Sequence, residues 1–183
     1  MQNKTLPPID VVLCMQEDGG IGLGLNLLYK SKELPGDMQR FIDLTMDKVL
    51  IMGRKTWLSI PSKYRKFDGR FVIVITRNPN DLEDTEKVGT ICGSLIEAIH
   101  YARTNLPDKG IVCGGGGNVY EQIFPYTTNV YLTIVKSKRP ADIIVTIPEY
   151  FVEVSRVENT HAGLDYNFMH MRKRKNPEEK YAD

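Results

Sequence analysis

Residues 49–61 read VLIMGRKTWLSIP, and this stretch decides the fold class. The apolar run Val49–Met52 has the pattern of a short buried strand, and the helical stretch Thr56–Ile60 follows it almost directly. A strand that leads straight into a helix is the repeating unit of a parallel sheet. Arg54 and Lys55 at the start of the helix oppose its macrodipole, which favours a bound anion there, although a solvated basic turn fits the motif equally well.

The same alternation extends on both sides of this stretch. Apolar, β-branched runs predict strands at Ile9–Met15, Val49–Met52, Phe71–Thr76, Lys87–Ile91 and Ile111–Cys113. Helical patterns occur at Pro35–Met46, Thr56–Ile60, Ser94–Arg103, where a capping box opens the helix, and Asn118–Phe124. Later runs without helices between them predict antiparallel edge strands at Asn129–Val135, Phe151–Val157 and Asp165–Arg172. The sequence thus predicts an α/β fold, with a mostly parallel sheet, flanking helices and antiparallel C-terminal edge strands.

Composition is that of an ordinary globular protein of one domain. The chain has 183 residues, 42% of them hydrophobic and 26% charged, and a formal net charge of +1. This balance argues against binding to nucleic acid or to anionic membranes through the overall field. No apolar run approaches the ~18 residues of a membrane span, and no signal peptide is visible. We therefore expect a cytoplasmic protein, with flexible ends at about residues 1–8 and 174–183.

Cysteine and histidine usage argues against disulfides and metal sites. The cysteines form an odd set without C-x-x-C spacing, which predicts free thiols in a reducing compartment at Cys14, Cys92 and Cys113. No metal-ligand spacing relates the histidines, and we expect no metal at His100, His161 or His170.

Two glycine-rich regions are candidate ligand-binding loops. The segment Gln16–Leu34 holds four glycines and no clear periodicity, which is typical of an active-site lid, with a tolerated surface insertion as the alternative. The run Gly114–Gly117 stands between a predicted strand and a predicted helix, where bare backbone lets amide groups approach a pyrophosphate. Thr76-Arg77 and Gly93-Ser94 also follow predicted strands. The C-terminal ends of the strands in an open parallel sheet face one crevice, so we expect both pairs to lie there with the glycine run and with Arg54-Lys55.

Asp37 is the candidate catalyst. It lies one helical turn before Phe41, on the apolar stripe of the predicted helix Pro35–Met46. An aspartate in a first helical turn is commonly only a partner of the helix dipole, but burial would raise its pKa and let it hold a proton near neutral pH. Arg70 is a candidate for a forked contact with a ligand carboxylate, and Thr133 for a hydrogen bond across the sheet.

Taken together, these residues are similar to the dihydrofolate reductase family. Residues 49–61 carry the most distinctive likeness, and other matches follow in the family's order: Gly20-Ile21-Gly22, Leu34-Pro35-Gly36-Asp37, Gly69-Arg70, Thr76-Arg77, the glycine run with Val119-Tyr120, Tyr131-Leu132-Thr133 and Tyr166-Asn167-Phe168. The resemblance implies an eight-stranded sheet in a single domain over residues 1–183. It also implies NADPH-dependent reduction of 7,8-dihydrofolate to tetrahydrofolate, with hydride transfer to C6 and protonation of N5, within one-carbon metabolism. Antifolate inhibitors and a monomeric state are implied as well.

The resemblance assigns roles by position. Asp37 matches the carboxylate that binds the pterin and assists protonation, Thr133 matches its hydrogen-bond partner, and Tyr29 stands for a tryptophan that orders water near the acid. Substrate contacts are implied for Val12, Leu27, Asp37, Met38, Phe41, Ser59, Ile60, Arg70, Gly114, Tyr120 and Thr133, of which Arg70 holds the glutamate-tail carboxylate. NADPH contacts are implied for Cys14, Ile21, Gly22, Gly53, Arg54, Lys55, Thr56, Ile75, Thr76, Arg77, Ser94, Gly115, Gly116, Gly117, Asn118, Val119 and Tyr120, with a cis peptide at Gly115-Gly116.

Departures from the family pattern fall near the lid and the bound rings. Extra residues lie within Lys30–Glu33, which leaves the closed shape of the loop open. Gly93 stands where a basic residue often contacts the 2′-phosphate, so selectivity over NADH would depend on Arg54 and Arg77. The other departures are Leu28-Tyr29 for Pro-Trp, Cys14 for alanine, Gly114 for an aliphatic residue, and Ile143 for the threonine after Asp142.

Two other functions stay open at this point. A pyrimidine reductase of riboflavin synthesis resembles this fold and uses NADPH, but Arg70 and the Leu34–Asp37 motif favour folate. A non-catalytic folate- or nucleotide-binding module, acting through the basic run Arg172–Lys175, is the alternative from a different class.

Overall fold

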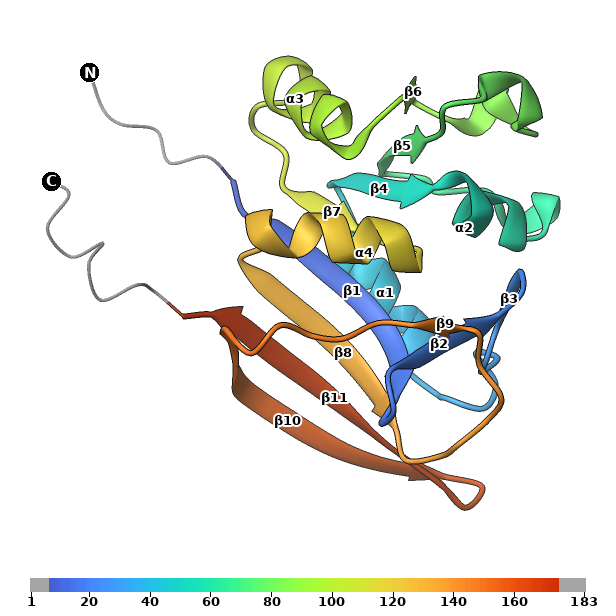
Figure 1. Ribbon diagram of the computed structural model, residues 1–183, viewed down its shortest axis with the longest axis vertical. Coiled ribbons are helices and arrows are strands. Elements are labelled where there is room, and N and C mark those ends of the chain that lie inside the picture. The colour runs from blue at the N-terminus through green and yellow to red at the C-terminus, as the bar shows by residue number, and fades with distance from the viewer. Residues whose placement is uncertain (1–6, 175–183) are drawn as a thin grey trace, which may run out of the picture.

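The computed structural model describes residues 7–174 and is built on an eight-stranded sheet of order β10-β11-β8-β1-β7-β4-β5-β6 (Figure 1). Its strands are β1 Ile9–Gln16, β4 Val49–Gly53, β5 Phe71–Ile75, β6 Thr90–Cys92, β7 Ile111–Cys113, β8 Asn129–Val135, β10 Phe151–His161 and β11 Leu164–Lys173. The helices are α1 Asp37–Thr45, α2 Arg54–Ser59, α3 Leu95–Asn105 and α4 Gly117–Ile123, with short turns η1 Ser62–Tyr64, η2 Pro79–Asp81, η3 Thr85–Lys87 and η4 Phe124–Tyr126. The ends that we expected to be flexible, and Lys175 of the basic run, lie almost entirely outside the described residues.

Helices cover both faces of the sheet because strand side chains alternate in direction. Along β4, Val49 and Ile51 join a core with α3 and α4, whereas Leu50 and Met52 join a second core with Trp57 of α2. All four β4 side chains are buried, as is typical of a central parallel strand. The predicted α/β fold is confirmed.

Helical crossovers decide the direction of most strands. β8 pairs in parallel with β1, because α4 and η4 carry the chain back between β7 and β8. Our expectation that residues 129–135 are antiparallel is therefore wrong for the pairing with β1. The antiparallel pairs β8–β11 and β11–β10 confirm the rest of that prediction. The strand expected at Lys87–Ile91 is β6, which begins only at Thr90, since Lys87 is the last residue of η3.

The glycine-rich segment (residues 16–34) contains regular structure although its sequence has no clear periodicity. It contains the strands β2 (Gly20–Leu23) and β3 (Asn26–Leu27), and β2 pairs with β9 (Ile143–Ile144) in a separate three-stranded sheet. The Asp142 carboxylate accepts a hydrogen bond from the Gly24 amide, at 2.9 Å to its Oδ1 atom. The partner residues lie far later in the chain, so no local periodicity reveals this pairing.

Two further findings concern the described part of the chain. Within residues 7–174, no helix is long and apolar enough to cross a membrane. In the same range, no group of three or more His, Cys, Asp and Glu side chains is arranged to hold a metal ion. The thiols of Cys14, Cys92 and Cys113 are free.

Candidate active site

Asp37 opens α1 because the residues before it fix the entry of the chain. Gly36 has a φ of 86°, a left-handed conformation that favours glycine. The Tyr166 hydroxyl donates to the Pro35 carbonyl across 2.8 Å, and the Asp37 amide donates to the carbonyl of buried Leu34 across 3.1 Å. These contacts hold the first turn of the helix, and with it the Asp37 carboxyl, against the sheet.

Asp37 and Thr133 meet between α1 and β8. The Thr133 hydroxyl donates to Asp37 Oδ1 across 2.6 Å, and Thr133 is only 1% exposed. Burial raises the pKa of the half-buried Asp37 carboxyl, while the Thr133 hydrogen bond and the charge of Arg40 oppose that rise. A carboxyl with a raised pKa holds its proton at a higher pH than an exposed one, which suits it to proton transfer.

The neighbouring thiol and phenols remain neutral at ordinary pH. Cys14 lies beside Thr133 in the pairing of β1 with β8, and burial, followed by the charge of Asp37, raises the pKa of its thiol. Burial also raises the pKa of Tyr166 and of Tyr120, whose hydroxyl donates to the Val12 carbonyl across 2.8 Å. Burial thus opposes ionisation of all four groups, and Asp37 is the carboxyl among them.

The glycine run (residues 114–117) packs closely against the end of β4. The Gly53 amide donates to the Gly115 carbonyl across 2.7 Å, and the peptide bond between Gly115 and Gly116 is cis, as the resemblance implied. A Cβ added to Gly116 would approach Thr56 Oγ1 to 2.9 Å, so the position leaves no room for a side chain. The run therefore forms a cradle lined by backbone, beside the cations that follow β4.

Cations gather where β4 and β5 end. Arg54 Nη1 lies 3.1 Å from Asp81 Oδ2 in an ion pair, and Lys55 and Arg77 are exposed. The other residues expected at a cofactor occupy neighbouring elements: Ile21 and Gly22 in β2, Ile75 in β5, and Gly117, Asn118 and Val119 in α4.

Two hydroxyl groups expected at the cofactor also serve the local fold. Thr76 Oγ1 accepts a hydrogen bond from the Asn78 amide across 3.1 Å and so closes the turn after β5. Ser94 Oγ accepts from the Glu97 amide across 3.2 Å, while Glu97 Oε2 accepts from the Gly93 amide across 2.7 Å. The predicted capping box is confirmed, with Gly93 as the amide that the glutamate reaches.

Arg70 presents a buried nitrogen atom that needs a partner. Its Nε is buried without a hydrogen-bond partner among the described residues, and its Nη1 lies 3.4 Å from Thr45 Oγ1. The guanidinium lies 5.2 Å over the Phe67 ring. Because buried polar atoms in folded proteins are nearly always paired, this donor is available to an acceptor from outside the chain.

The side chains expected around a substrate ring differ in exposure. Half-buried positions are Val12, Phe41, Ser59 and Ile60. In contrast, Leu27 and Met38 are 74% and 52% exposed. A Cβ added to Gly114 would lie 3.1 Å from Leu50 Cδ1, so Leu50 occupies part of the space that an aliphatic side chain at residue 114 would fill.

Tyr29 lies within the glycine-rich segment and contacts Gln16 and Arg139. Its hydroxyl donates to Gln16 Oε1 across 3.0 Å, and the Arg139 guanidinium lies 4.4 Å over its ring. Tyr29 packs in a small core with Leu34, which is separate from the two cores of the main sheet. The Tyr29 hydroxyl thus ties this small core to the buried end of β1.

Sequence reasoning missed three residues that organise this region. Gln16 is fully buried and hydrogen-bonded to the backbone of Arg139, 123 positions away. Arg40 extends from α1 to the strands β8 and β11. Contacts between residues so far apart leave no local pattern, and none of the three stands in a motif.

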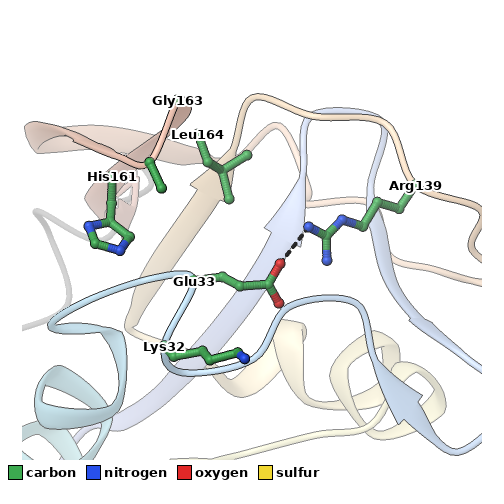
Figure 2. Close-up of a pocket in the computed structure, with 7 residues that line it drawn as sticks. Lys32, Glu33, Arg139, His161, Gly163 and Leu164 are labelled. Atoms are coloured by element: carbon green, nitrogen blue, oxygen red, sulfur yellow. Dashed lines mark hydrogen bonds and ion pairs between the residues drawn. The ribbon is translucent and has the colours of Figure 1, made fainter.

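A pocket of about 390 Å³ lies beside residues 30–33, the range within which the resemblance places extra residues (Figure 2). Arg139 Nη2 contacts Glu33 Oε1 at 2.6 Å across it, and the hairpin residues 161–164 line another wall. Its lining residues are not those that surround Asp37. Arg139 therefore anchors Glu33, apart from the candidate site.

Comparison with known proteins identifies the family. A family model described as dihydrofolate reductase matches residues 8–173. The chain is 32% identical to a dihydrofolate reductase of Saccharomyces cerevisiae, over 90% of this chain and 81% of that protein. It is 31% identical to a dihydrofolate reductase of Mycobacterium tuberculosis, over 73% of this chain and 75% of that protein. A bifunctional dihydrofolate reductase-thymidylate synthase of Glycine max is 30% identical over 86% of this chain, which spans only 32% of that longer protein. The chain therefore belongs to the dihydrofolate reductase family.

Proposed function

We propose that this protein catalyses the NADPH-dependent reduction of 7,8-dihydrofolate to 5,6,7,8-tetrahydrofolate. Membership of the family supports a nicotinamide cofactor and a folate substrate. The observation that carries the proposal is the hydrogen bond between Thr133 and Asp37, which holds a partly desolvated carboxyl between α1 and β8. The cofactor, when bound, supplies the hydride that C6 of the pterin accepts.

Asp37 would bind the pterin ring and assist the protonation of N5. Burial favours its protonated form, and the Thr133 hydroxyl fixes the direction in which one carboxylate oxygen points. The second oxygen is free of any hydrogen bond from the Thr133 hydroxyl, so it can face the ring. Positioning and exclusion of water are then the main contributions of the protein to the reaction.

The residues at the ends of β4 and β5 fit a cofactor with a 2′-phosphate. Arg54, Lys55 and Arg77 supply positive charge, and the cradle of residues 114–117 leaves backbone accessible where a Cβ would collide. The charges favour NADPH over NADH because only NADPH carries the extra phosphate. Gly93 adds no charge, so the selectivity for NADPH over NADH depends on Arg54 and Arg77.

Arg70 fits the glutamate tail of the substrate. Its orphaned Nε and its neighbouring Nη atoms can donate two parallel hydrogen bonds to one carboxylate. Such a fork removes the cost of the unpaired buried nitrogen, since a charged acceptor then satisfies it. Antifolates with a similar tail would meet the same arginine.

The test mixes the purified chain with NADPH and dihydrofolate and follows both the loss of reduced-nicotinamide absorbance and the appearance of tetrahydrofolate. We expect turnover by the unaltered protein, and a decrease of about 100-fold or more at pH 7 in Asp37→Asn, because a positioned general acid contributes on that scale. Asp43→Asn, on an exposed part of the same helix, is the matched control and should retain activity. Unchanged NADPH and dihydrofolate would refute the proposed reaction, and full activity of Asp37→Asn would refute the role of Asp37.

A further inference from the structure

Arg40 links the helix that carries the acid to the strand that carries its partner. It follows Asp37 by three residues on α1, so the two side chains share one face of the helix. Its Nη1 donates to the Leu132 carbonyl across 3.1 Å, and its Nη2 donates to the Met169 carbonyl across 2.9 Å. The guanidinium also lies 4.9 Å over the Phe168 ring. Arg40 is therefore held by β8 and β11 at once, in a single orientation.

The same guanidinium reaches the hydroxyl that contacts the acid. Arg40 Nη1 lies 3.5 Å from Thr133 Oγ1, and Thr133 Oγ1 lies 2.6 Å from Asp37 Oδ1. Arginine has only donors, whereas a threonine hydroxyl has one proton to give. Thr133 must therefore accept from Arg40, and its own proton is directed to Asp37. One hydroxyl thus separates a fixed positive charge from the catalytic carboxyl.

The ionisable side chains that face this pair directly are a thiol, three phenols and an imidazole, and the charged Asp10 and Arg172 act on Tyr131 and His170. Asp37 faces Cys14 from β1, Tyr120 from α4 and Tyr166 from β11, and burial raises the pKa of each. Arg40 faces Tyr131 from β8, whose pKa is raised, and His170 from β11, whose pKa is lowered by burial and by Arg172. Among the described residues, Arg40 carries the permanent charge that acts on Asp37, and this charge lowers the pKa of the carboxyl.

We propose that Arg40 is a positioning residue for the reduction, which directs the Thr133 hydroxyl to Asp37 and sets the pH range in which the acid works. The inference rests on the proposed function. Turnover consumes a proton, so it should fall as the pH rises through the titration of Asp37. A positive charge nearby favours the carboxylate and moves this fall to lower pH. Removal of the charge should move it to higher pH.

The experiment compares the pH dependence of kcat in Arg40→Gln and in the unaltered protein, at saturating NADPH and dihydrofolate. Glutamine keeps a donor for the strand carbonyls but removes the charge. We expect the alkaline midpoint to rise by about one pH unit, the lower end of what a nearby opposite charge produces. Arg40→Lys, which retains the charge, should keep the original midpoint. The ¹³C resonance of the Asp37 carboxyl, titrated without substrate, should show the same shift.

Two controls separate this effect from its alternatives. Arg156→Gln makes the same change in net charge on the exposed strand β10, where Arg156 pairs with Glu153, and should leave the midpoint unchanged. His170→Gln removes the imidazole that faces Arg40 and should also leave the midpoint unchanged. An unmoved midpoint in folded Arg40→Gln, or an equal shift in either control, overturns the inference. If Arg40→Gln does not fold, a shifted midpoint in Arg40→Lys overturns it and an unshifted one supports it.

The carboxyl titration distinguishes failure of this inference from failure of the proposed function. Absence of turnover in the unaltered protein removes the proposed reaction, but the ¹³C titration still tests whether Arg40 controls Asp37. Turnover with an unmoved midpoint and an unmoved titration leaves the reaction in place and removes the role of Arg40.

Discussion

The side-chain amide of Gln16 and the backbone of Arg139 form a closed pair of hydrogen bonds. Gln16 Nε2 donates to the Arg139 carbonyl across 2.8 Å, and the Arg139 amide donates back to Gln16 Oε1 across 2.9 Å. The Tyr29 hydroxyl donates to the same Oε1 atom across 3.0 Å. One buried amide at the end of β1 therefore joins the glycine-rich segment to the loop that follows β8.

Replacement of Gln16 by leucine should strongly destabilise the fold. The variant keeps the volume but removes the partner that the Gln16 side chain provides to the Arg139 amide, the Arg139 carbonyl and the Tyr29 hydroxyl. Each unpaired buried group costs about 1–3 kcal/mol, and partial relaxation leaves an expected loss of about 2–4 kcal/mol in the free energy of unfolding. Chemical denaturation measures it. Gln122→Leu, at an exposed residue bonded only within its own helix, is the control, and an equal effect of both variants would contradict the prediction.

The contacts of Glu33 with Arg139 and with the Lys30 amide should persist down to unusually low pH. The hydrogen bond from Arg139 and the amide of Lys30 lower the pKa of its carboxyl from 4.5 to about 2. A depressed pKa in the folded state means that the interaction is fully present above pH ~4.5 and is lost as the pH falls toward the folded value. The Lys30 amide shift, followed by NMR, should titrate at that low pH.

The variant Glu33→Gln removes this charge and should speed hydrogen exchange at Lys30. Neutral glutamine cannot form the ion pair with Arg139, so residues 30–33 should leave their folded conformation more often. Glu86→Gln, at an exposed residue, provides the comparison and should leave exchange at Lys30 unchanged. Equal protection of the Lys30 amide in Glu33→Gln and in the unaltered protein would show that the ion pair does not hold the segment.

Local sequence patterns predict the strands of the sheet because each buried strand is a short run of apolar residues. The bounds of β7 and β8 agree with the predicted runs, since a buried strand needs consecutive apolar residues. The direction of β8 is harder to predict, because it depends on the crossover through α4 rather than on the residues of the strand itself. The two-residue strand β9 is too short to carry a period, and it exists only because β2 lies beside it.

The acid was visible in the sequence, but its surroundings were visible only in part. Asp37 stands on an apolar stripe, and the family resemblance supplied Thr133 as its partner, which the structure brings to 2.6 Å. Arg40 gave no signal, because a cation one turn along a helix is usually solvated. Its contacts with β8 and β11 depend on tertiary packing, as do those of Gln16.

Arg70 should control the binding of dihydrofolate without affecting the chemical step. Loss of a forked, charge-assisted contact in Arg70→Met should raise KM for dihydrofolate by about 10- to 100-fold. Because the tail lies away from the reacting ring, kcat should change by less than about twofold. Dihydropteroate lacks the glutamate tail, so the variant and the unaltered protein should use it equally well. A similar rise in KM for both substrates would show that Arg70 acts through the fold instead.

Arg54 should decide the preference for NADPH, and Asp81 should moderate it. Arg54→Gln removes a charge that only the 2′-phosphate exploits, so kcat/KM should fall about tenfold with NADPH and stay nearly constant with NADH, as expected for one partly exposed charged contact. Asp81 holds Arg54 at 3.1 Å and adds a negative charge beside the phosphate. Asp81→Asn should therefore change the NADPH-to-NADH ratio in the opposite direction. Lys63→Gln, in η1, is the control for net charge. If kcat/KM of Arg54→Gln falls equally with NADPH and NADH, Arg54 does not recognise the 2′-phosphate. Damage to the fold would lower kcat/KM with both nucleotides alike.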